Sequence, residues 1–158
     1  MEVFIMKALK KWFPLISLIC GAVALVMLFL PCLKVPGESY NGLKAAFGNK
    51  DAGFGFSILN TVTFVAAIAG GVLAYLGAKK GNNVMKYVAL ACFAVAAIFF
   101  FCMVNFSQPS KDIVDVIGKS AAKKMMEEAL DLGIGAILGG IACLVGAASV
   151  ACDTFIKE

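Results

Sequence analysis

Six cysteines are the residues of this 158-residue chain with the widest chemical scope, because thiols bind metals, form disulfides and act as nucleophiles. They stand at positions 20, 32, 92, 102, 143 and 152, with no C-x-x-C pair and no histidine to complete a zinc set. We therefore expect no metal site, and we expect most of the thiols to be small core residues. Cys32 and Cys102 fall near the same face of the predicted membrane domain. A disulfide between them is one alternative, and two free thiols on diagonal helices are the other.

Two glycine-containing motifs invite a nucleotide-binding interpretation, but both are incomplete. Gly118-Lys119-Ser120 matches the end of a phosphate-binding loop, yet the position that needs the earlier glycine is Ile113. Gly133-Ile134-Gly135 lacks the third glycine of a dinucleotide fingerprint, so we interpret it as helix-packing glycine. All fourteen basic residues are lysine, which disfavours nucleic-acid recognition and imidazole chemistry. We expect no cofactor, no nucleic-acid partner and no enzymatic activity.

The composition indicates that the lipid bilayer is part of the solvent of this chain. It is 61% hydrophobic, with a mean hydropathy of +0.93, and its charges gather between long apolar runs. We predict a single domain over residues 1–158, an all-α membrane protein built as a four-transmembrane-helix bundle with a short surface helix before the last span. The expected spans are residues 12–33, 56–78, 84–106 and 132–152, each about the 20 residues that cross a bilayer.

The short basic segment between the second and third spans predicts the orientation. This hairpin, residues 79–83, begins with Lys79 and Lys80 and is followed closely by Lys86, and lysine-rich short loops stay in the cytoplasm. We therefore expect a multi-pass plasma-membrane protein with both termini cytoplasmic and with outer loops at residues 34–55 and 107–131. Lysines divide evenly, seven on each side, but the net charge is +4 inside and zero outside.

Both outer loops are expected to contain short helices. Leu43 to Phe47 is predicted to form one that ends at Gly48, a typical position for a helix-terminating glycine. Ser110 is predicted to cap the surface helix that precedes the last span.

Small residues recur at every fourth position of the second and fourth spans, namely Ala66, Gly70 and Ala74 in one, and Gly135, Gly139, Cys143 and Ala147 in the other. Such ridges allow close helix packing in lipid. Asn60 and Asn105 lie near the outer ends of adjacent spans, where we expect a hydrogen bond between them. No Asp, Glu, Arg or His lies in the spans, and Lys86, at the edge of the third, is counted with the hairpin. Proton relays and ion-coupled transport, which need ionisable groups at membrane depth, are therefore disfavoured.

The segment Ser39-Tyr40-Asn41-Gly42-Leu43-Lys44-Ala45-Ala46-Phe47-Gly48, followed by Phe56-Ser57-Ile58-Leu59-Asn60 and the Lys79-Lys80 stop, resembles four-span membrane proteins of low-GC Gram-positive bacteria. The larger first loop is also similar in layout to claudin-type tetraspans. The claudin first-loop tryptophan has no counterpart, because Trp12 is the only tryptophan here.

The two ridges predict a non-enzymatic protein that acts through contacts of its helices and outer loops, either self-assembling as a homo-oligomer or serving as a small subunit with a membrane-protein partner. The alternative is a transporter or pore component whose path forms between protomers. An enzyme acting on lipid has the least support, since no set of catalytic side chains lies in the spans.

Overall fold

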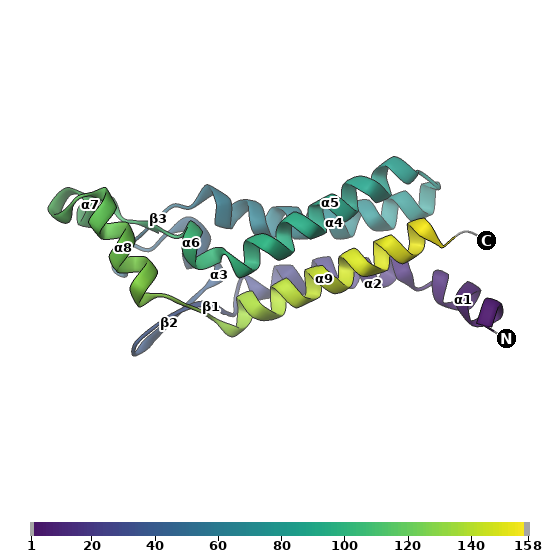
Figure 1. Cartoon of the computed structure of the whole chain (residues 1–158), viewed down its shortest axis with the longest axis horizontal. Coiled ribbons are helices and arrows are strands. Elements are labelled where there is room, and N and C mark those ends of the chain that lie inside the picture. The colour runs from purple at the N-terminus through teal and green to yellow at the C-terminus, as the bar shows by residue number, and fades with distance from the viewer. Residues whose placement is uncertain (1, 157–158) are drawn as a thin grey trace.

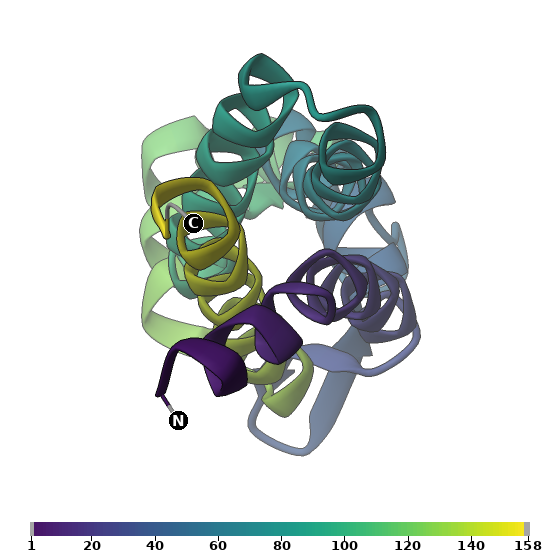
Figure 2. The same ribbon diagram turned by 90° about the vertical axis from the view of Figure 1, so that its right-hand side faces the viewer.

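The computed structural model describes residues 2–156, and the chain is mostly helical. Its four longest helices run along the long axis of the molecule, namely α2 (Phe13–Met27), α4 (Ile58–Lys80), α5 (Asn83–Phe101) and α9 (Ile134–Phe155) (Figure 1). Seen from the end, they form a ring in the order α2, α4, α5 and α9 (Figure 2). Helix α2 is therefore diagonal to α5. A further helix, α1 (Glu2–Lys10), extends from the end where both termini lie.

Three of these helices, α4, α5 and α9, are long and apolar enough to cross a membrane. Helix α2 is apolar but has 15 residues, which is about 22 Å of helix against a hydrocarbon core of ~30 Å. The helical part of the expected first span ends at Met27, because residues 31–35 form a strand instead. The expected third span is broken at Cys102, after which α6 (Met103–Phe106) follows.

Aromatic rings of α5 fill spaces that glycines leave on the neighbouring helices. Phe93 and Phe100 are fully buried. A Cβ atom added to Gly70 of α4 would lie 3.2 Å from the ring of Phe93, and one added to Gly146 of α9 would lie 2.8 Å from it. One added to Gly139 would lie 2.7 Å from the ring of Phe100. These glycines therefore admit large side chains to the centre of the bundle.

The small-residue ridges face this same core. Their buried members are Gly70, Ala74, Gly135, Gly139 and Cys143, and their half-buried members are Ala66 and Ala147. Both ridges are thus used between helices of one chain. The closest approach of α2 and α4 involves a glycine pair outside the ridges. A Cβ on Gly21 would lie 3.1 Å from the Cα of Gly71.

Short strands join the two long loops, so the chain is not all-helical as expected. Strand β1 (Pro31–Val35) pairs antiparallel with both β2 (Glu38–Asn41) and β5 (Asp131–Leu132). Strand β3 (Phe54–Gly55) pairs with β4 (Gln108–Pro109). Strands this short carry no readable alternation of apolar and polar residues, which is why the sequence did not indicate them.

The expected short loop helix is present as α3 (Gly42–Phe47), which ends at Gly48 with φ 84°. The single surface helix is instead two, α7 (Lys111–Ile117) and α8 (Lys119–Ala129), separated at Gly118 with φ 85°. Only glycine adopts such a backbone angle readily, so the break falls there. Ser110 is at the N-cap position of α7 but makes no side-chain capping hydrogen bond.

Gly139→Leu should destabilise the bundle, because even a Cβ at this position meets the buried ring of Phe100. Overpacking of this kind costs about 1–3 kcal/mol. The measurement is the thermal unfolding of the purified protein in lipid nanodiscs. Leu138→Ile, on an exposed side of the same helix, is the matched control and should unfold like the parent. Equal unfolding of both variants would contradict this packing.

Candidate functional site

The two outer loops fold into one unit, which we call the cap and define as residues 31–57 and 107–133. The cap lies at the end of the bundle opposite both termini (Figure 1). Pairing of β1 with β5 and of β3 with β4 connects its two halves. Gly133 approaches β1 closely, and its N–H donates to the carbonyl of Cys32 at 2.7 Å. Two loops far apart in sequence therefore form a single surface.

Buried polar side chains at the start of α4 attach the bundle to both halves of the cap. The fully buried Nδ2 of Asn60 donates to the carbonyl of Ala45 at 3.0 Å and to Oγ of Ser107 at 3.4 Å. The hydroxyl of Ser57 donates to the carbonyl of Phe106 at 2.7 Å. The expected Asn60–Asn105 hydrogen bond does not form, because Asn105 points to the exposed side of α6.

The six cysteines are free thiols, so Cys32 and Cys102 are not joined. Cys32 is fully buried, and its thiol donates to the carbonyl of Met27 at 3.2 Å. It packs against α9, because a Cβ on Gly135 would lie 2.9 Å from its Sγ. Burial raises the pKa of the Cys32 thiol to about 12, so it stays protonated and unreactive at neutral pH. Among residues 2–156, no three His, Cys, Asp or Glu side chains gather as metal ligands would.

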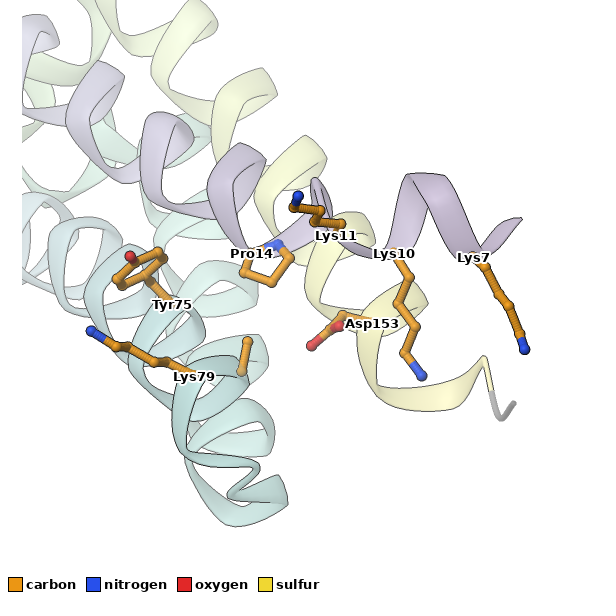
Figure 3. Close-up of a pocket in the computed structure, with 8 residues that line it drawn as sticks. Lys7, Lys10, Lys11, Pro14, Tyr75, Lys79 and Asp153 are labelled. Carbon is orange, nitrogen blue, oxygen red and sulfur yellow. The ribbon is translucent and has the colours of Figure 1, made fainter. Parts of the chain in front are cut away.

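A basic pocket of about 510 Å³ opens at the opposite end of the molecule. It is lined by residues from α1, α2, α4 and α9, namely Lys7, Lys10, Lys11, Pro14, Tyr75, Ala78, Lys79 and Asp153. Figure 3 shows Lys7 and Lys10 on one side of Asp153, Tyr75 and Lys79 of α4 on the other, and Lys11 above it in this view. From the sequence, these lysines were expected only to set the orientation of the chain in the membrane. Their gathering into one pocket depends on the tertiary arrangement, because Lys7 and Lys79 are more than seventy positions apart in the sequence.

Among the described residues that line this pocket, the carboxylate is that of Asp153, and a lysine from another helix neutralises it. Lys86 of α5 contacts Oδ2 of Asp153 on α9 at 2.6 Å, and the two side chains are only 12% and 9% exposed. Asp153 lies just beyond the expected last span, and the sequence did not indicate that it pairs with Lys86. Their positions could have indicated the pair, since both residues lie within about one turn of their helix ends at the same end of the bundle. With Asp153 paired, the pocket keeps a positive charge.

Asn60→Ala should loosen the cap, because it removes the donor that serves Ala45 and Ser107 in a fully buried setting. Loss of a buried hydrogen bond costs about 1–3 kcal/mol. Hydrogen–deuterium exchange should rise in α3 and in residues 107–117, and the thermal midpoint should fall. The matched control is Asn105→Ala, an exposed asparagine of the same bundle end that should change neither quantity. If the two alanine variants exchange alike, Asn60 does not hold the cap.

Comparison with protein-family models, with curated proteins and with solved structures finds no match for this chain. The resemblance to bacterial four-span proteins and to the claudin layout stays a prediction. The cap and the basic pocket are the features of this structure that bear on its function.

Proposed function

We propose that this chain is a non-enzymatic, four-span plasma-membrane protein whose cap binds a membrane-protein partner. The observation that carries this proposal is the construction of the cap. Two loops separated by two long helices are paired strand to strand and held by Asn60 to the bundle, which presents one ordered surface away from the bilayer. A binding surface on a rigid support loses little conformational entropy when it docks.

The side chains on the outermost helices of the cap support contact with a protein. Helices α7 and α8 expose Val116 (81%), Ile117 (41%) and Met125 (61%). Residues 111–129 contain four lysines and four acidic residues, so this arm has no net charge to attract an ionic ligand. Exposed apolar side chains among balanced charges fit a protein surface better than a charged solute.

The packing of the ridges favours a subunit role over self-assembly. The ridge glycines are covered by the same chain: Gly70 by Phe93, Gly139 by Phe100 and Gly135 by Cys32 and Pro31. They are not available to a second copy in this arrangement. We therefore assign the partner contact to the cap. The crosslinking experiment below distinguishes a different membrane protein from a second copy of this chain.

The fourth crossing and the orientation belong to the same proposal. Helix α2, with the turn at residues 28–30, completes a four-span bundle beside α4 and α9. The termini and the turn between α4 and α5 share one end, and the lysines around them favour the cytoplasm for that end. The cap then faces outward. Phe93, Phe100 and Met103 are fully buried at the bundle centre, so a solute path would have to form between protomers, as the pore alternative requires.

Val116→Glu should reduce partner binding at least several-fold, because it places a charge on the most exposed apolar position of the arm. The measurement is site-specific photo-crosslinking from the cap in native membranes, read by mass spectrometry. Lys119→Gln changes the net charge by the same amount on the same arm and should leave the crosslinks intact. Unchanged crosslinks in Val116→Glu, or crosslinks only to a second copy, would count against a subunit role. Solute flux through reconstituted liposomes would support the pore alternative.

The orientation can be tested by placing single cysteines at Asn83 and Val116 in a background without Cys32 and Cys102. Both positions are exposed, one at the α4–α5 turn and one on the cap. An impermeant thiol reagent added to intact cells should label the cysteine at 116 and spare the one at 83. The reverse labelling would show that the cap faces the cytoplasm.

A further inference from the structure

An apolar groove lies along the outer seam between α2 and α4, about one helical turn from the basic pocket. Pro14 and Tyr75 lie between the two, since both line the pocket and are one turn from the groove. The groove has a volume of about 230 Å³ and is lined by Leu18, Gly21, Ala22, Leu25, Ile68 and Val72. The exposed Ala22 brings little side-chain volume to this seam, whereas Gly21 lies against the backbone of α4. The groove is open on the side that faces the lipid, where Ala22 and Val72 are exposed.

The dimensions of the seam match one half of a bilayer. Lys79 lies in the last turn of α4, and Ile68 is about three turns further along, or ~16 Å away. Half of a hydrocarbon core is about 15 Å thick. A lipid with its headgroup at Lys79 would therefore place an acyl chain alongside the whole groove.

The charges of the pocket select the headgroup. Lys11, in the turn between α1 and α2, and Lys79, at the end of α4, are exposed and line the pocket, and Lys7 adds a third positive charge (Figure 3). Asp153 would repel an anion if it were unpaired, but its ion pair with Lys86 removes most of that repulsion. Basic pockets between membrane helices bind anionic headgroups. The exposed ring of Tyr75 stands at the depth where tyrosines favour the headgroup boundary.

We infer that the α2–α4 seam binds one anionic phospholipid of the leaflet nearest the termini, with its phosphate at Lys11 and Lys79 and one acyl chain in the groove over Ala22 and Val72. This site is separate from the cap and does not depend on a partner bound there. It would connect the turn between α1 and α2 to the end of α4 through the lipid.

The headgroup half of the inference is tested by native mass spectrometry of the full chain with added dioleoylphosphatidylglycerol or dioleoylphosphatidylcholine. The parent protein should retain phosphatidylglycerol about tenfold more strongly. Lys11→Gln with Lys79→Gln should remove that preference. Lys119→Gln with Lys124→Gln removes the same charge from the cap and should keep it. If both double variants lose the preference equally, the preference depends on the net charge of the protein and not on Lys11 and Lys79, and the proposed site is wrong.

The acyl half is tested by filling the groove. Ala22→Phe should lower retention of phosphatidylglycerol about tenfold, whereas Ala148→Phe, an exposed alanine on the lipid side of α9, should not. Retention unchanged by Ala22→Phe would overturn the placement of the chain. Soluble glycerol 3-phosphate should fail to displace the lipid. Displacement at equal concentration would identify a site for a free phosphate ester and overturn the lipid assignment.

Discussion

The fit of two phenylalanine rings of α5 against glycines of its neighbours sets the spacing of the bundle. Helices in a bilayer are already surrounded by apolar lipid, so burying apolar side chains between them gives no hydrophobic gain. They are held together instead by close van der Waals contact between surfaces of matching shape. Phe93 occupies space left by Gly70 and Gly146, and Phe100 occupies space left by Gly139. Helix α5 therefore packs on α4 and α9 at once. Helix α2 approaches α4 through Gly21 and Gly71, where the backbones of the two helices are in contact.

This spacing also places the helix ends, and the helix ends make the cap possible. Strands of two to five residues are marginal by themselves. They persist here because α2, α4 and α9 deliver β1, β3 and β5 to the same place, and because Asn60 and Ser57 bond to backbone carbonyls on either side. The cap is consequently an extension of the bundle rather than a separate domain. A surface built in this way can hold its shape while it contacts a partner.

The two ends of the molecule handle polar groups in opposite ways. At the cap, the buried amide nitrogen of Asn60 and the hydroxyl of Ser57 donate to neutral partners, while Oδ1 of Asn60 has no hydrogen-bond partner. At the other end, the Lys86–Asp153 pair is matched within the bundle, and the surplus lysines face a pocket. A surface with balanced charges fits protein contact, and an open, positive pocket fits an anionic headgroup. The asymmetry supports different roles for the two ends of one bundle.

Much of this architecture follows from local patterns that the chain carries in its sequence. Apolar run length indicated where the helices lie, and Gly48 marked the end of the first loop helix, because those features depend on residues within a few positions of each other. The sequence could not show that Asn60 bonds to Ala45 and Ser107 instead of Asn105, or that Asp153 meets Lys86. It also suggested that the glycine ridges serve other chains, whereas α5 and strand β1 of the same chain cover their glycines. Such pairings join residues far apart in sequence, and only the packing of the whole bundle decides which of several suitable partners lies within reach.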